Sequence, residues 1–126
     1  MKNPDDGFIR GRLRSIKFAF KGMWLLLTTE DSIKAQTTAA LIATAAGFYF
    51  EISPTEWMFQ LIVIGMVLVA EAMNTAVEKM ADFVHEDYHE KIGFIKDIAA
   101  GAPGFAAMIS LIVACIIYLP KIIILF

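Results

Sequence analysis

Residues 61–82 read LIVIGMVLVAEAMNTAVEKMAD, an apolar run that passes without a break into a stretch with acidic and amide side chains. Four of these polar side chains share one face of a helix, because at about 100° per residue they lie within about 80° of one another. They are Glu71, Asn74, Glu78 and Asp82. Charged side chains that continue so apolar a segment are costly to place in a membrane, so they are expected to have a function. The stretch therefore predicts a helix with a polar stripe, which the rest of the chain is expected to position.

The composition indicates a membrane protein. Hydrophobic residues make up 58% of the 126 residues, and the mean hydropathy is +0.64. A soluble domain of this size has too little interior to bury so much apolar surface. The net charge of −2 gives no basis for a nucleic-acid partner. Because Cys115 is the single cysteine, an internal disulfide and a cysteine zinc site are excluded. We expect residues 1–126 to form one all-α membrane domain.

The apolar pattern predicts one surface helix and three membrane-spanning helices. Residues 8–29 have an apolar face flanked by basic side chains, which is typical of a helix lying on an anionic membrane surface. An ordinary core-facing helix is the alternative. Apolar segments at about 33–52, 57–80 and 96–120 are long enough to span a membrane. Residues 82–96 are expected to form a polar connection, and the pair Pro103-Gly104 is a candidate for a kink.

The distribution of basic residues predicts the orientation. Seven of the eleven Lys and Arg residues precede the first predicted span, three lie between the second and third, and one follows the third. Basic residues are enriched on the cytoplasmic side of membrane proteins. We therefore expect the N-terminus and the open end of the polar stripe to face the cytoplasm.

The stripe has the groups that phosphate chemistry requires. Glu71 and Glu78 are two helical turns apart, about 10 Å along one face, with Asn74 between them. Carboxylates suit Mg²⁺, which accepts phosphate oxygens as its other ligands. A poorly solvated carboxylate such as Glu71 is also a candidate general base. For Asp82, the competing interpretation is a solvated residue where the helix leaves the membrane.

Other polar residues are weaker candidates. Lys96-Asp97 opens the third predicted span, where a lysine either binds a phosphate or anchors the helix at the interface. Glu30 lies at the cytoplasmic interface and, taken alone, is an ordinary solvated acid. His85 and His89 have the spacing of metal ligands on a helix, but surface residues in an acidic loop are the simpler interpretation.

Two further classes of function remain open from the residues alone. An intramembrane glutamate is also how proton or ion translocators work, and a non-catalytic membrane adaptor is a third possibility. A translocator needs the buried acid but has no need of Asn74, Glu78 and Lys96 beside it. No phosphate-binding loop, dinucleotide fingerprint or nucleophile elbow occurs in the sequence.

The motif Glu71-x-x-Asn74-x-x-x-Glu78-x-x-x-Asp82, followed by Lys96-Asp97, resembles that of the small prokaryotic integral-membrane lipid kinases. That family contains diacylglycerol kinase and undecaprenol kinase. The resemblance extends from about Arg14 to the third span and includes Glu30, eight residues after Gly22. It implies a homotrimer in the bacterial cytoplasmic membrane, with active sites between subunits on the cytoplasmic side.

The resemblance also implies a role for each site residue. Glu71 would take the proton from the lipid hydroxyl, and Glu30 and Glu78 would hold Mg²⁺ on the phosphates of ATP. The remaining residues would contact phosphate or nucleotide or shape the site: Asn74, Lys96, Arg14, Asp97 and Asp82. The run from Lys96 to Ala102 (KDIAAGA) is closer to undecaprenol kinase than to diacylglycerol kinase. Undecaprenol is therefore the expected lipid, and diacylglycerol is the alternative.

Overall fold

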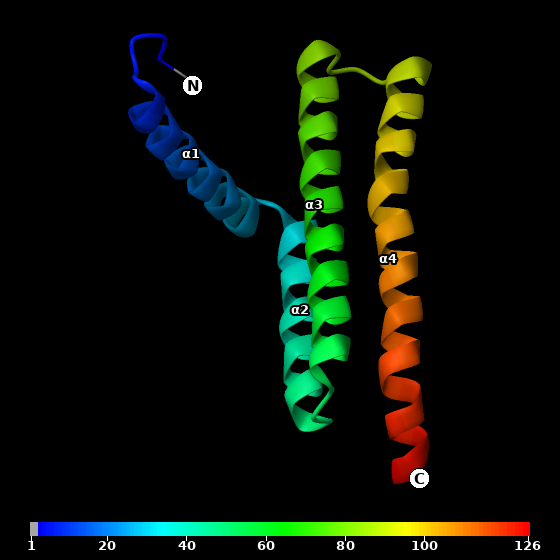
Figure 1. Ribbon diagram of the computed structural model, residues 1–126. Coiled ribbons are helices and arrows are strands. Elements are labelled where there is room, and N and C mark those ends of the chain that lie inside the picture. Colours follow the sequence, from blue (N-terminus) through cyan, green and yellow to red (C-terminus); the bar gives the residue numbers. More distant parts are fainter. Residues whose placement is uncertain (1–2) are drawn as a thin grey trace.

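A computed structural model describes residues 3–126, which form four helices and no strand (Figure 1). The helices are α1 (Phe8–Thr29), α2 (Asp31–Tyr49), α3 (Pro54–Val84) and α4 (Glu90–Leu125). The all-helical expectation is confirmed. Helices α2, α3 and α4 lie side by side, whereas α1 leaves the others at an angle (Figure 1).

Helix α1 is separated from α2 by one residue. Glu30 has extended backbone angles (φ −105°, ψ 116°), which interrupt the helical path between Thr29 and Asp31. The apolar side chains of α1 are exposed, among them Phe8, Leu13, Phe20 and Trp24. A long helix with its apolar face uncovered needs a partner such as lipid to cover that face.

A tight turn joins α2 to α3. Glu51 adopts a left-handed conformation (φ 50°), and the Ile52 N–H closes the turn on the carbonyl of Gly47 at 3.1 Å. Helix α3 then begins with a complete capping box. The Ser53 hydroxyl accepts from the Glu56 N–H at 3.1 Å, and the Glu56 carboxylate accepts from the Ser53 N–H at 2.9 Å. Pro54 occupies the first helical turn, where its missing N–H costs nothing.

The small side chain of Gly47 allows α2 and α3 to approach closely beside this turn. A Cβ atom at position 47 would lie 2.6 Å from Cη2 of Trp57, closer than two carbon atoms can pack. Beside this contact, the Trp57 ring is tilted against the Phe48 ring, with 4.9 Å between the two ring centroids. Small side chains allow such close packing of helices in a membrane.

Helices α3 and α4 are longer than the sequence indicated. Residues 90–96, expected in the polar connection, are helical, so the connection comprises only residues 85–89. His89 begins α4 by accepting the Lys91 N–H on its Nδ1 atom at 3.1 Å, which is a local signal that hydropathy does not detect. Helix α4 continues through Pro103, and Pro103 is buried, so the candidate kink does not interrupt the helix.

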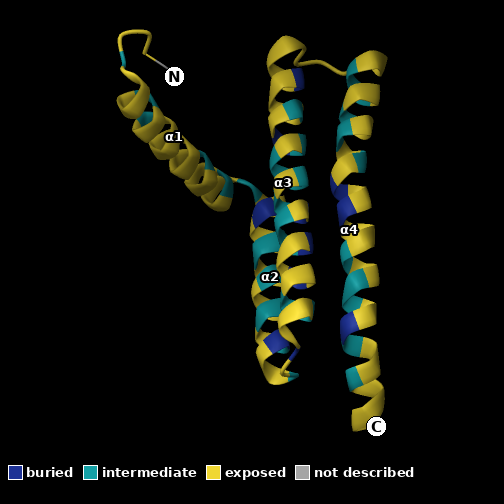
Figure 2. Cartoon of the chain, viewed as in Figure 1, coloured by how far each residue is buried: buried dark blue, intermediate teal, exposed yellow. Residues whose placement is uncertain are grey.

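Helices α3 and α4 are also long and apolar enough to cross a membrane. Helix α2, with its alanines and threonines, does not reach that hydropathy over residues 31–49. Most side chains on all four helices are exposed in the single chain (Figure 2). The buried side chains are few and lie where α2, α3 and α4 meet. They include Ile33, Val63, Val67 and Ala106. A soluble monomer rarely exposes so much contiguous apolar surface.

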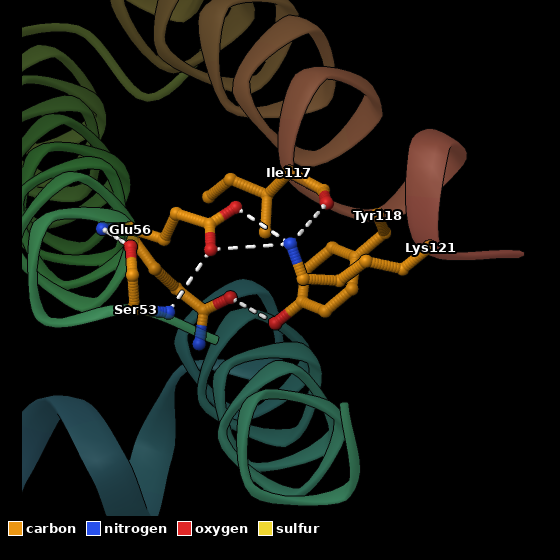
Figure 3. A network of polar contacts seen from close by, with 6 residues as sticks. Ser53, Glu56, Ile117, Tyr118 and Lys121 are labelled. Carbon is orange, nitrogen blue, oxygen red and sulfur yellow. Dashed lines mark hydrogen bonds and ion pairs between the residues drawn. The ribbon is translucent and has the colours of Figure 1, made fainter. Parts of the chain in front are cut away.

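A polar network fastens α3 to α4 at the end next to the α2–α3 turn (Figure 3). Lys121 Nζ donates to Glu56 Oε2 at 2.8 Å and to the carbonyl of Ile117 at 3.2 Å. One turn away, the Tyr118 hydroxyl donates to Gln60 Oε1, and Gln60 Nε2 donates to the carbonyl of Ala43 in α2 at 3.0 Å. Gln60 is only 4% exposed, so its amide depends on these partners.

Candidate active site on helix α3

The polar stripe lies on the half of α3 that is far from this network. Glu71 and Asn74 are half-buried, whereas Glu78 and Asp82 are exposed. Asn74 Nδ2 donates to Glu78 Oε1 at 3.3 Å, one helical turn along. Along α3, Glu71 lies nearest the middle of the apolar region, and Asn74, Glu78 and Asp82 follow in that order toward the polar end of the helix.

Two groups in the stripe have free hydrogen-bonding capacity. Asn74 Oδ1 is buried and has no hydrogen-bond partner within residues 3–126. Glu71 forms no side-chain hydrogen bond or ion pair in the same part of the chain. Buried acceptors in native proteins are almost always paired, so an unpaired one marks a place where a donor or a cation is expected.

Glu30 belongs to the same region, although it lies forty-one residues before Glu71. The break between α1 and α2 turns its side chain toward α3, where Lys79 Nζ lies 3.1 Å from its Oε1 atom. The Thr29 hydroxyl donates to the same oxygen at 3.3 Å. The carboxylate is 20% exposed, so it is partly shielded from water. The structure thus brings the helix junction against the polar end of α3.

Lys96 reaches the stripe from α4. Its Nζ forms a charged hydrogen bond with Asp82 Oδ1, which links the polar ends of α3 and α4. Asp97 is exposed and has no ion pair among residues 3–126. The sequence-predicted lysine therefore lies beside the stripe, whereas its neighbour does not contact it.

Arg14 is not brought to the stripe within one chain. It lies in α1, which diverges from the bundle (Figure 1), and its guanidinium is paired with Asp6 at 2.8 Å. The Asp6 side chain is only 5% exposed, so the segment before α1 folds back over Arg14. If Arg14 contributes to the same site as Glu71, a second copy of the chain or a movement of α1 has to bring them together.

Sequence reasoning missed two charged residues in these contacts, Asp6 and Lys79. Lys79 follows Glu78 in the sequence, where it counts only as one of the basic residues that predict the orientation. Its contact with Glu30 joins residues 49 positions apart, and helical periodicity contains no information about such distant partners. Asp6 precedes the predicted helix, and the position of its carboxylate close to the basic side chains of α1 was the indication in the sequence that such an ion pair could form.

Two of the carboxylates in this region are of the chemical type that binds a Mg²⁺ ion held partly by a nucleotide. No group of three or more His, Cys, Asp or Glu side chains gathers as a metal cage in the described residues. Mg²⁺ is usually bound by one or two carboxylates, with phosphates and water completing its octahedral shell. Glu30 and Glu78 supply hard oxygen donors of this kind, and the unpaired Asn74 Oδ1 lies on the same helix face as Glu78.

The two histidines of the connecting loop behave as surface residues. His85 Nδ1 lies 2.7 Å from the carbonyl of Asp87, and His89 Nδ1 accepts from the backbone N–H of Lys91. Their rings are 5.4 Å apart and exposed. Both Nδ1 atoms are therefore engaged in shaping the loop, which agrees with the simpler of the two interpretations of the pair.

Comparison with known proteins adds a family to this geometry. A family model for prokaryotic diacylglycerol kinase matches residues 17–118. Undecaprenol kinase from Bacillus subtilis is 35% identical over 108 residues, which cover 86% of this chain and 88% of that protein. Diacylglycerol kinase from Escherichia coli K12 is 24% identical over 117 residues, which cover 93% of this chain and 95% of that protein. The matched residues include the whole of α2 and α3.

Proposed function

Since the chain belongs to the prokaryotic diacylglycerol kinase family, we propose that it transfers the γ-phosphate of ATP to the hydroxyl of a membrane lipid, with undecaprenol favoured over diacylglycerol. The chain is thus a bacterial membrane protein and a lipid kinase by family. Its dependence on ATP and Mg²⁺, its lipid and its site residues are our proposals. The translocator hypothesis rested on an intramembrane glutamate alone, whereas the family match supports a lipid kinase.

The observation that carries the proposal is the half-buried, unpaired carboxylate of Glu71 beside the unpaired Asn74 Oδ1. We assign Glu71 as the general base. A carboxylate with no partner in the described residues is free to accept the proton of a hydroxyl that binds beside it. As Glu71 takes the proton from the lipid hydroxyl, the lipid oxygen bonds to the γ-phosphorus, and ADP departs with the electrons of the broken P–O bond.

The other groups neutralise charge and position the nucleotide. Glu30 and Glu78 would hold Mg²⁺, which when bound neutralises the charge on the phosphate oxygens. Lys96 would contact the transferred phosphate, and Asp82 would hold that lysine in place through the ion pair between α3 and α4. Asn74 would orient Glu78 and the incoming hydroxyl. Asp97 would face the nucleotide. Phosphoryl transfer chiefly requires placement and charge neutralisation, so a phosphate-binding loop is unnecessary.

The assembled enzyme would be a homotrimer in which α2, α3 and α4 cross the cytoplasmic membrane. The separation of Arg14 from Glu71 supports a site shared between subunits, because one copy of α1 could deliver its arginine to a neighbour. The extensive exposed apolar surface supports burial against both lipid and other subunits. The excess of basic residues before α2 supports a cytoplasmic N-terminus and a cytoplasmic active site.

The proposal is tested with purified protein in mixed micelles that contain either undecaprenol or diacylglycerol. Radiolabelled ATP is supplied with Mg²⁺ or with EDTA, and the phosphorylated lipid is extracted and counted. We expect phosphorylated lipid only when Mg²⁺ is present, and we expect faster turnover with undecaprenol than with diacylglycerol. A folded protein that phosphorylates neither lipid would contradict the kinase assignment, and faster turnover with diacylglycerol would reverse the lipid preference.

A further inference from the structure

Within residues 3–126, three cations that lie beside the stripe or are assigned to the proposed site are each paired with a carboxylate. Arg14 contacts Asp6, Lys79 contacts Glu30, and Lys96 contacts Asp82. Arg14 and Lys96 already have proposed roles toward phosphate. Lys79 has none, yet its partner Glu30 is one of the two proposed metal ligands. This pairing leads to an inference about Lys79, and the inference rests on the proposed function.

The Lys79–Glu30 pair is a surface ion pair in which the lysine is weakly held. The Lys79 side chain is 69% exposed, whereas the Glu30 carboxylate is 20% exposed, so the lysine approaches from solvent and lies over a shielded acid. Its Nζ is 3.1 Å from Oε1, the oxygen that also accepts from the Thr29 hydroxyl. The lysine has a long flexible stem and a strongly hydrated charge, so little holds it there apart from the carboxylate.

A divalent cation and an ammonium group compete for this carboxylate. Two cations on one oxygen repel each other strongly, because their separation would be only a few ångströms. Mg²⁺ held by Glu30 would weaken the attraction of that carboxylate for Lys79, and the phosphates that accompany the metal would offer the lysine a new partner. We propose that Lys79 is a further phosphate-binding residue: it neutralises Glu30 while the site is empty and turns to a phosphate oxygen of ATP when the metal takes Glu30.

The local charge balance supports the second half of this exchange. Glu71, Glu78 and Glu30 contribute three negative charges to the region, and the Mg²⁺ complex of ATP adds further negative charge. Lys96 is already paired with Asp82, and Arg14 with Asp6, so a third cation would add to the neutralisation of the bound nucleotide. Lys79 follows Glu78 directly in α3, so its stem starts beside the proposed metal ligand. A lysine at that point binds phosphate as a point charge without needing a fixed geometry.

The test measures two affinities in the full-length protein in detergent, neither of which requires turnover. Mn²⁺ serves as the probe for the metal, and its binding is followed by electron paramagnetic resonance without nucleotide. Binding of Mn²⁺ with a non-hydrolysable ATP analogue is then followed by calorimetry. In Lys79→Gln, Mn²⁺ alone should bind about two- to fivefold more tightly, because a competing surface ion pair is gone. The analogue should bind about tenfold more weakly, because a charged contact is lost.

Opposite changes in the two affinities separate exchange from a merely structural contact. If Lys79 only fastened the helix junction to α3, its removal would weaken both affinities or change neither, and either result would overturn the inference. Lys79→Arg should retain both affinities within about twofold. Lys91→Met is the matched control, since Lys91 is an exposed lysine without an ion pair in the described residues, and it should leave both unchanged.

The outcome also distinguishes this inference from the proposed function. Wild-type protein that binds the Mn²⁺ complex of the analogue, together with an unchanged Lys79→Gln variant, would remove Lys79 from the site and leave the kinase assignment intact. Wild-type protein that binds no nucleotide would overturn the proposed function and the phosphate contact together.

Discussion

Removing the Tyr118 hydroxyl should destabilise the protein through its effect on Gln60. In Tyr118→Phe, the Gln60 Oε1 atom loses its donor while the side chain stays 4% exposed. A buried acceptor without a partner costs about 1–3 kcal/mol in mutational data. Polar contacts between membrane helices are worth somewhat less, about 0.6 kcal/mol on average and at most about 1.7 kcal/mol. We therefore expect the free energy of unfolding to fall by about 1–2 kcal/mol.

The same reasoning predicts that a second change restores part of the loss. In Gln60→Leu/Tyr118→Phe, both polar partners are replaced by apolar groups of similar size, which can be nearly neutral. The carbonyl of Ala43 also loses its side-chain donors, but it lies within α2, where a backbone N–H one turn later is its helical partner. The double variant should therefore lose less than the two single variants together, with a coupling of about 1 kcal/mol.

Equilibrium unfolding of the purified protein in mixed micelles, followed by circular dichroism as the fraction of denaturing detergent rises, measures these differences. Tyr49→Phe is the matched control, because Tyr49 is 74% exposed and its hydroxyl forms no hydrogen bond within residues 3–126. It should shift the free energy of unfolding by less than about 0.5 kcal/mol. Strictly additive losses in the double variant, or equal losses at Tyr49 and Tyr118, would refute the buried network.

Two further predictions concern helix packing and the nucleotide. Gly47→Ala should destabilise the protein by about 1–3 kcal/mol in the same unfolding experiment, because its Cβ would overlap Trp57, whereas Gly65→Ala, with nothing within 4 Å, should not. Equal effects at the two glycines would contradict the close approach of α2 and α3. Lys96→Met should raise the KM for ATP about tenfold or more, because the phosphate loses a charged partner. An unchanged KM with normal folding would leave Lys96 only its contact with Asp82.

Much of the fold follows from hydropathy and helical period. Both predict an all-helical chain, and the residues expected to form the surface helix, 8–29, coincide with α1. The ends of α3 and α4 were predicted too short because local signals extend them past the apolar core. Ser53 and Pro54 start α3 before the expected residue 57, and His89 starts α4 before residue 96. These caps are polar, so a hydropathy scan assigns them to loops.

The site was predictable only in part for a related reason. A period of 3.6 residues determines which side chains share a face, and this was sufficient for the stripe on α3. It does not determine which residue of one helix meets which residue of another. The contacts Lys79–Glu30, Lys96–Asp82 and Lys121–Glu56 depend on the axial register between helices. That register comes from packing, such as Trp57 against Gly47, which the sequence pattern does not specify.

The most direct test of the account is the turnover of Glu71→Gln with undecaprenol, measured beside its binding of nucleotide. Removal of a general base should lower kcat by about 10²–10⁴-fold and leave the affinity for the Mg²⁺ complex of ATP within about twofold, because Glu71 has no ion pair to break in the described residues. Glu51→Gln, an exposed acid in the α2–α3 turn, is the control and should retain full activity. Turnover of Glu71→Gln equal to that of the wild type would contradict the assignment of Glu71 as the base.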